Sequence, residues 1–173
     1  MGSQTETQQQ AFLEAYDTYA DALFRHCFFR VYDRDVAEDL VQDAFMKTWN
    51  EVAKGTTIEN IRAFLYRVTN NLIIDYVRKK KSVSLDAMVE EGFSPSDFGA
   101  REHVMEQAIG RDVNRILSIL DEEYRVPVIM RLVDGMTPRE IAEALDVSEN
   151  VVSVRIHRAM QKLRDFYGPS ELL

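Results

Sequence analysis

Apolar residues recur every three or four positions along most of the chain, with polar residues between them. This spacing places the apolar side chains on one face of a helix, so it predicts amphipathic helices. We expect a first helix around residues 12–31, a second around 36–49 and a third around 61–76. We find no convincing alternation of apolar and polar residues, the pattern that predicts a β-strand. The expected fold class is therefore all-α.

A polar stretch divides this helical pattern into two parts. Between residues 82 and 101 the chain is rich in serine, glycine and acidic residues, which is the composition of a linker. Helical spacing resumes at Val104. We therefore expect two small helical domains, at 8–81 and 106–168, joined by a flexible acidic linker at 82–105.

Three local features affect where the expected helices begin, bend or end. The first ten residues, MGSQTETQQQ, lack the charged and apolar segments of a signal peptide, and we expect a disordered start there. Pro127 lies inside a helix expected at about 122–133, which it should bend or deprive of one backbone hydrogen bond. Gly135 follows as a natural end to that helix.

The second domain ends in a pattern typical of a helix-turn-helix. Thr137, Pro138 and Glu140 form a start signal, because threonine caps the first amide groups and glutamate closes a capping box. Asp146 lies in the turn, where a left-handed backbone is often needed and aspartate tolerates it. Ser148 caps a second helix, whose apolar stripe consists of Val152, Ile156, Ala159 and Leu163. The pattern predicts a unit that fits a DNA major groove, with an ordinary αα-corner as the alternative.

The charges along the chain are grouped by sign. The 173 residues carry a formal net charge of −8, which argues against a protein that coats nucleic acid nonspecifically. Residues 33–51 are mainly acidic, 62–81 mainly basic and 82–106 acidic again. Blocks of opposite sign suggest that different faces meet different partners.

Little in the sequence points to catalysis or to a bound cofactor. Cys27 is the only cysteine and lies among apolar residues, which is typical of a reducing cytoplasm. His26, His103 and His157 are scattered, with no metal-ligand spacing, and no glycine-rich phosphate loop occurs. No run of about 18 apolar residues is present to span a membrane. We therefore expect a cytoplasmic protein without metal, cofactor, enzymatic activity or membrane insertion.

Three strings of the sequence, in this order and spacing, resemble bacterial RNA polymerase sigma factors of the extracytoplasmic-function (ECF) type, group IV of the sigma-70 family. They are DRDVAEDLVQDAFMKTW at 33–49, AFLYRVTNNLIIDYVRKKK at 63–81, and LDEEYRVPVIMRLVDGMTPREIA at 120–142. The resemblance implies that 8–81 is sigma region 2, a helical bundle, and that 106–168 is sigma region 4. It implies two partners: promoter DNA, and a core RNA polymerase contacted at the clamp helices of its largest subunit and the flap of its second-largest subunit.

The acidic helix at 35–49 matches the segment that docks on the clamp helices. Carboxylates there can form charge-assisted hydrogen bonds with arginines of a partner coiled coil. Taken without the flanking strings, the same residues fit a solvated helix face. The residues that the resemblance assigns to core polymerase are Glu38, Asp39, Gln42, Asp43 and Lys47.

The third helix matches the segment that melts and reads the minus-ten element, with the loop at 54–60 forming part of a base pocket. Single-stranded DNA needs a positive groove with aromatic or amide groups. Tyr66 lies off the apolar stripe and is expected to be able to stack on a base, whereas Tyr76 continues the stripe into the core. The basic cluster at 78–81 also fits a helix end stabilised by the helix dipole. The residues implied here are Arg62, Tyr66, Arg67, Asn70, Asn71, Arg78, Lys79 and Lys80.

The last helix matches the segment that reads the minus-thirty-five element. Arginine is the best direct reader of guanine, and Val154 could contact a thymine methyl group. Thr137 and Arg139 lie at the start of the preceding helix, where phosphate contacts are expected. The residues implied are Thr137, Arg139, Ser153, Val154, Arg155, His157, Arg158 and Lys162.

Two other functions fit the sequence less well. A stand-alone helix-turn-helix regulator should dimerise, but 8–81 shows no sustained dimer heptad. An enzyme would need a set of catalytic residues, and none is recognisable in this sequence. In the sigma family that the sequence resembles, members are often bound by an anti-sigma factor. For the acidic linker two alternatives remain: it mimics nucleic acid, or it serves only as a flexible tether. At its net charge, the free chain is expected to bind duplex promoter DNA poorly.

Overall fold

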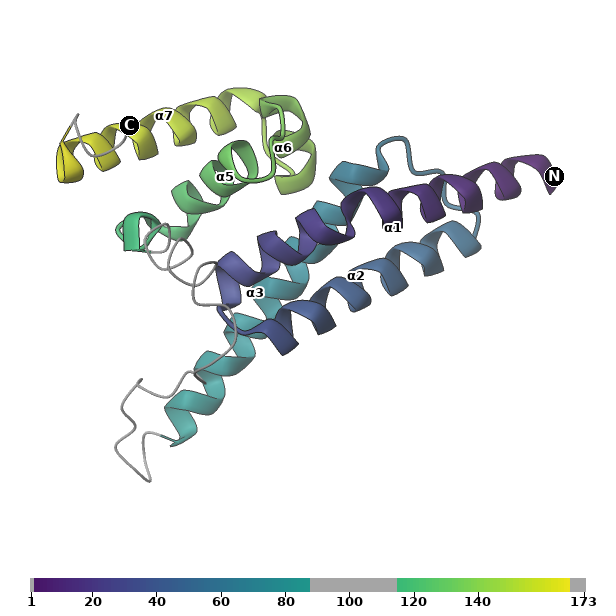
Figure 1. The fold of residues 1–173 in the computed structure, drawn as a ribbon, viewed down its shortest axis with the longest axis horizontal. Coiled ribbons are helices and arrows are strands. Elements are labelled where there is room, and N and C mark those ends of the chain that lie inside the picture. The colour runs from purple at the N-terminus through teal and green to yellow at the C-terminus, as the bar shows by residue number, and fades with distance from the viewer. Residues whose placement is uncertain (1, 88–114, 169–173) are drawn as a thin grey trace.

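The computed structural model describes residues 2–87 and 115–168, and Figure 1 shows that these are built from helices. The elements are α1 (Gly2–Val31), α2 (Arg34–Ala53), α3 (Ile61–Ala87), α5 (Glu122–Leu132), α6 (Pro138–Leu145) and α7 (Glu149–Tyr167). The described ranges contain no strand, which confirms the expected all-α class.

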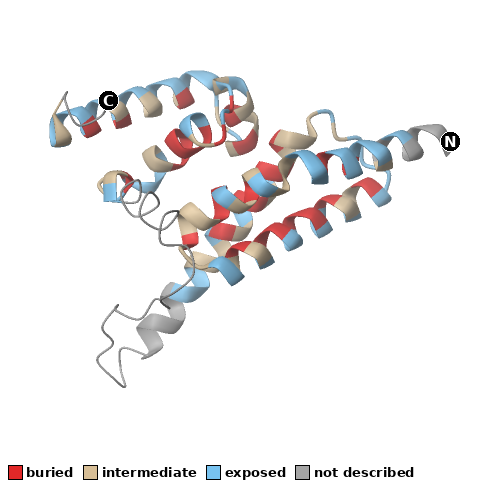
Figure 2. Ribbon diagram, viewed as in Figure 1, coloured by how far each residue is buried: buried red, intermediate tan, exposed pale blue. Residues whose placement is uncertain are grey.

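Helices α1, α2 and α3 form one bundle, the N-terminal unit. The chain reverses between α1 and α2 at Tyr32, whose φ of 54° is left-handed. Asp33 then caps α2 by accepting a hydrogen bond from the amide of Val36, at 3.1 Å. Leu23 and Leu65 are fully buried between the helices, and Figure 2 shows buried positions along the inner faces of the bundle.

Helices α5, α6 and α7 form the C-terminal unit. Ile129 of α5 packs against Ala159 and Leu163 of α7 in a core of their own. Pro127 is buried inside α5 and does not end it. The helix ends at Leu132, and Gly135 follows with a φ of +63°.

The two units do not stand apart. One hydrophobic cluster contains residues of α1, α2 and α3 together with Val126, Met130, Met136 and Ile141 of the C-terminal unit. In Figure 1 the short helix α6 lies beside the start of α3. The sequence predicted two domains and a tether, but long-range burial joins the domains face to face.

Two boundaries differ from those expected. Helix α1 begins at Gly2, in the segment expected to be a disordered start, because residues 2–11 continue the helix without a glycine or proline after Gly2. Helix α3 continues to Ala87, so residues 82–87 are helical rather than linker. The rest of the expected linker, 88–105, and the periodic segment that begins at Val104 and runs to 114 lie outside the described residues.

Candidate nucleic-acid interface and associated faces

The helix-turn-helix is fixed by caps at both of its helices. Thr137 accepts a hydrogen bond from the amide of Glu140, and the Glu140 carboxylate accepts one from the amide of Thr137 at 2.8 Å, so the predicted capping box is present. Asp146 ends α6 in the left-handed conformation, with φ 55° and ψ 46°, as expected. Ser148 caps α7 through the amide of Val151. The turn geometry that the sequence predicted is therefore confirmed.

The outer face of α7 is open to solvent. Val152, Ala159 and Leu163 are buried against α5 and α6, which turns the opposite side of the helix outward. The residues predicted to read the minus-thirty-five element that lie exposed on that side are Ser153, Val154, His157 and Arg158.

Two basic residues of α7 form ion pairs with acidic residues at the start of α5. Arg155 is half-buried and forms an ion pair with Glu123 of α5, at 3.7 Å between nitrogen and oxygen. Lys162 lies 3.5 Å from the carboxylate of Asp121, just before α5. Both contacts join α7 to the start of α5, so these side chains brace the C-terminal unit in this arrangement.

The cations at the start of α3 are engaged by α6 and the turn before it. Arg62 donates to Glu140 at 3.0 Å and to the main-chain oxygen of Asp134 at 2.6 Å, and its guanidinium lies over the ring of Tyr19. Arg67 donates to the main-chain oxygen of Glu143, at 2.9 Å. Both predicted minus-ten residues therefore contact the C-terminal unit, Arg62 from a partly buried position and Arg67 from an exposed one.

Two further predicted minus-ten residues are buried. Tyr66, expected to be available for stacking on a base, is fully buried in the cluster that the two units share and meets His26 of α1 edge-on. Burial raises the pKa of its hydroxyl. Asn70 accepts a hydrogen bond from Arg30 of α1. Neither side chain is accessible in this arrangement.

The later part of α3 is accessible. Asn71, Arg78, Lys79 and Lys80 are all exposed. Arg78 forms an ion pair with Asp75 one turn earlier, and Lys80 lies over the ring of the half-buried Tyr76 at 5.9 Å. The predicted basic end of α3 is thus a solvent-facing surface.

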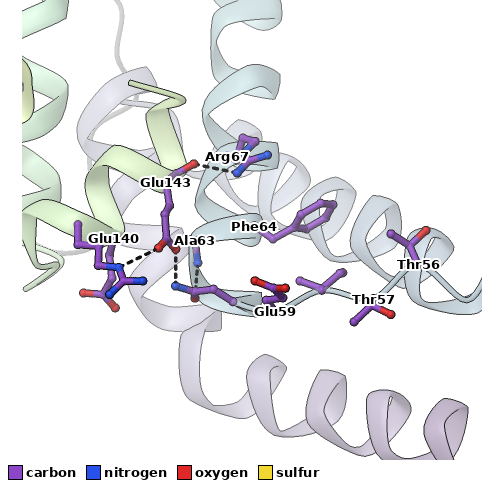
Figure 3. Close-up of a pocket in the computed structure, with 11 residues that line it drawn as sticks. Thr56, Thr57, Glu59, Ala63, Phe64, Arg67, Glu140 and Glu143 are labelled. Atoms are coloured by element: carbon purple, nitrogen blue, oxygen red, sulfur yellow. Dashed lines mark hydrogen bonds and ion pairs between the residues drawn. The ribbon is translucent and has the colours of Figure 1, made fainter. Parts of the chain in front are cut away.

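A cleft of about 720 Å³ opens where the loop at 56–60 meets α6 (Figure 3). Asn60 spans it, donating from its amide nitrogen to the Glu143 carboxylate at 2.8 Å and accepting from the amide of Ala63. Arg139, predicted to contact phosphate, lies on its rim within 3.4 Å of Glu143. The loop assigned to a base pocket therefore does line a cleft, and two glutamates of α6 form one wall of it.

These contacts lower the pKa of the Glu140 carboxyl. Partial burial raises its pKa, but hydrogen bonds from Thr137 and the charge and hydrogen bond of Arg62 outweigh burial, so the pKa lies below its ordinary value of 4.5. The glutamate is therefore charged at neutral pH. That charge lies against Arg62 of α3.

A separate acidic face lies on α2. Asp39, Gln42, Asp43 and Lys47 are exposed at helical spacing, and none of them forms an ion pair with another described residue. Glu38 is half-buried and pairs with Arg34 at 2.9 Å. Met46 lies within the same face at 61% exposure. Sequence reasoning missed Met46, although its position three residues after Asp43 places it there; we call Asp39, Gln42, Asp43, Met46 and Lys47 the α2 face.

A buried polar pair joins the two units. Nδ1 of His26 in α1 lies 2.8 Å from the carboxylate of Asp134, and the two side chains are 0% and 1% exposed. Arg30, also on α1, bonds to Glu122 at the start of α5. No local sequence signal could have found these pairs, since His26 and Asp134 lie 108 positions apart. They join the C-terminal unit to α1.

The described residues contain no group of three or more histidine, cysteine or acidic side chains arranged to hold a metal ion. None of their helices is long and apolar enough to cross a membrane.

Comparison with known families gives two matches. The model of the family described as Sigma-70 region 2 matches residues 15–83, which cover most of α1 together with α2 and most of α3. The model described as Sigma-70, region 4 matches residues 110–163, which include α5 and the helix-turn-helix. The two matches follow the two units of the structure.

Individual proteins are similar over nearly the whole chain. The ECF RNA polymerase sigma factor SigW of Bacillus subtilis is 28% identical, over 90% of this chain and 88% of its own. The ECF RNA polymerase sigma factor SigE of Mycolicibacterium smegmatis is also 28% identical, over 92% of this chain and 64% of its own.

Two solved structures share the fold. The sigma factor RpoE in complex with the anti-sigma factor NepR, from Bartonella quintana, has a TM-score of 0.72 at 21% identity, covering 94% of this chain and 99% of that one. CnrH in complex with the cytosolic domain of CnrY has a TM-score of 0.72 at 22% identity, covering 98% of this chain and 96% of that one.

Proposed function

The chain belongs to the sigma-70 family of RNA polymerase sigma factors, in its ECF group. On this basis we propose which partner is contacted by each of three surfaces, on α2, α3 and α7. As a sigma factor it directs promoter-specific transcription initiation by RNA polymerase. The α2 face docks on core polymerase, α3 reads and melts the minus-ten element, and α7 reads the minus-thirty-five element.

The α2 face suits a basic partner. Asp39 and Asp43 lie one helical turn apart and have no ion-pair partner among the described residues, so their charge is available to arginines on the polymerase clamp helices. Met46, between Asp43 and Lys47, adds an exposed apolar contact at the centre of a charged patch. An apolar centre with a polar rim is the usual composition of a specific interface.

The α7 face suits a DNA groove. Its helix is exposed on the side opposite α5 and carries Arg158 and His157 next to Ser153 and Val154. The N-terminal part of α7 therefore presents donors and one apolar side chain to base edges, as a recognition helix does. The proposed contact with the flap of the second-largest subunit rests on the family resemblance.

Promoter engagement requires the two units to separate. Elements centred near positions −10 and −35 are about 25 base pairs apart, or roughly 85 Å along B-DNA at 3.4 Å per base pair. In this structure α3 and α6 are in direct contact through Arg62 and Glu140.

The observation that carries the docking assignment is the unpaired acidic α2 face. We would mix the full chain with core RNA polymerase from Bacillus subtilis or Mycolicibacterium smegmatis and follow co-elution in size-exclusion chromatography. The double variant Asp39→Lys/Asp43→Lys should lose co-elution. The matched control Asp17→Lys/Asp21→Lys changes two exposed acids of α1 by the same charge and should co-elute normally. Equal co-elution of both variants would contradict the assignment.

The remaining parts of the proposal follow from the same premise. The chain acts in the bacterial cytoplasm, as a binding and DNA-melting subunit without an active site of its own. The solved structure of the sigma factor RpoE, which shares this fold, is a complex with the anti-sigma factor NepR, and this supports an anti-sigma partner for this chain as well.

A further inference from the structure

Two acids at the start of α5 each lie against a cation of α7. The Asp121 carboxylate lies 3.5 Å from the amino group of Lys162, and the Glu123 carboxylate lies 3.7 Å from the guanidinium of Arg155. Helix α5 packs alongside α7, with Ile129 in the core that the two helices share (Figure 1). Arg155 and Lys162 are seven positions apart, so they lie two turns apart on one side of α7. The two ion pairs therefore form a row between the helices.

Folding stability does not account for this row. Asp121 occupies the N-cap of α5, where an aspartate usually accepts a hydrogen bond from an amide of the first turn, but its side chain forms no such bond. The side chains of Asp121 and Glu123 are 73% and 55% exposed, and ion pairs between exposed groups contribute little to stability. The effect of these acids is therefore to be sought in the cations that they hold.

The paired cations flank the face of α7 that is proposed to read bases. Val154 and Arg158 are exposed on that face, and helical spacing places Arg155 and Lys162 between it and the buried side of α7. Side chains beside the reading face of a helix in the major groove meet the phosphates. Phosphate contacts are the same for every sequence and supply most of the nonspecific affinity. A carboxylate on each of these cations therefore weakens binding that carries no sequence information.

The cation on the reading face itself is not paired in this way. Within the ranges that the structure describes, Arg158 is exposed and forms no ion pair, so it remains available to read a base. Arg139, which is predicted to contact phosphate, is paired with Glu143 at 3.4 Å. In this helix-turn-helix, carboxylates thus lie against cations that are placed for phosphates and leave a cation that is placed for bases.

We propose that Asp121 and Glu123 are specificity-determining residues of the minus-thirty-five reader, because they hold Arg155 and Lys162 back from DNA phosphates. The proposal rests on the proposed function in one respect, namely that α7 reads the minus-thirty-five element. It adds that the affinity of this helix is kept low for DNA in general. Promoters with a mismatched upstream element then stay unused, since phosphate contacts alone do not hold α7 on them.

The first test removes the two carboxylate charges. In Asp121→Asn/Glu123→Gln the asparagine is still a favourable N-cap residue. The matched control Asp17→Asn/Asp21→Asn removes two exposed charges of α1, in the N-terminal unit. Each chain is assembled with core RNA polymerase from Bacillus subtilis. Its binding to two fluorescein-labelled duplexes is measured by anisotropy between about 50 and 200 mM KCl. One duplex is a promoter that the wild-type holoenzyme transcribes, and the other has the upstream element of that promoter scrambled.

The variant should bind both duplexes about fivefold tighter at the lowest salt concentration, with a salt dependence steeper by roughly 1–2 in log–log slope, because two more phosphate contacts release counterions. The gain should be equal for the two duplexes, and run-off transcription from the scrambled template should rise. The control should match the wild type in all three measurements. Unchanged affinity and salt slope in the variant would overturn the proposal.

The second test asks whether the acids act through the two cations. The background Arg155→Gln/Lys162→Gln lacks both, so adding Asp121→Asn/Glu123→Gln to it should change neither affinity nor salt slope. The same gain as in the wild-type background would mean that the carboxylates repel DNA directly, and would overturn the proposal. Failure of the proposed function would show separately, as a wild-type holoenzyme that binds the promoter and the scrambled duplex equally well.

Discussion

The buried pair of His26 and Asp134 gives the sharpest stability prediction, because truncating each partner leaves a different group behind. In His26→Ala the Asp134 carboxylate stays buried without its partner, which costs about 3–5 kcal/mol. The variant also loses the edge-on contact between His26 and Tyr66, whose ring centroids are 5.1 Å apart, worth about 0.5–1.5 kcal/mol. In Asp134→Ala an imidazole nitrogen loses its acceptor, which costs about 1–3 kcal/mol. His26→Ala should therefore be the more damaging change.

The double variant His26→Ala/Asp134→Ala removes both groups and should cost less than the sum of the single changes, by at least about 1 kcal/mol. Urea unfolding measures these free energies, followed by circular dichroism for the whole chain and by fluorescence of Trp49, the only tryptophan, for the N-terminal unit. In the wild type the two probes should give one midpoint, since the units share a core. In His26→Ala they should separate. A cost below about 0.5 kcal/mol for His26→Ala, or strictly additive single changes, would refute the idea that this pair joins the units.

Three further predictions concern local features. Asp146→Val should destabilise the chain by about 1–2 kcal/mol, because a β-branched residue is strained at φ 55°, whereas Asp146→Gly should stay within about 0.5 kcal/mol; urea unfolding compares them. Burial raises the pKa of the Cys27 thiol to about 12, so at pH 8 a thiol reagent should modify it only as fast as the protein unfolds, and rapid modification of folded protein would contradict its burial. The folded-state pKa of Glu140 is depressed below 4.5, so the stability from its contacts with Thr137 and Arg62 is present above that pH and is lost as pH falls through the folded value; Glu140→Gln should flatten that part of the stability–pH curve.

Local signals in the sequence predicted the helix-turn-helix closely. The capping box of Thr137 and Glu140, the left-handed Asp146 and the cap at Ser148 all depend on residues within four positions of one another. The spacing of Val152, Ala159 and Leu163 likewise fixed the buried side of α7 and hence its exposed face. Such features are readable because the physics that produces them is local.

The packing of the two units against each other could not be predicted from such local signals. Tyr66 lies off the apolar stripe of α3, and only packing against segments distant in the sequence, among them His26 of α1, makes it a core residue. The contacts of Arg62 with Glu140 and of His26 with Asp134 are of the same long-range kind. A helical period places a residue on a face but does not say which faces are covered by distant segments. The four minus-ten residues now covered or engaged were therefore expected to be free.

The central claim, that this chain directs promoter-specific initiation, is tested most directly by mapping transcription start sites on bacterial genomic DNA. Core RNA polymerase from Bacillus subtilis and from Mycolicibacterium smegmatis would be used with and without the chain. We predict that the chain adds a discrete set of start sites preceded by a shared pair of sequence elements, and that Asp39→Lys/Asp43→Lys abolishes that set. The same start sites with and without the chain, for both core enzymes, would contradict the account.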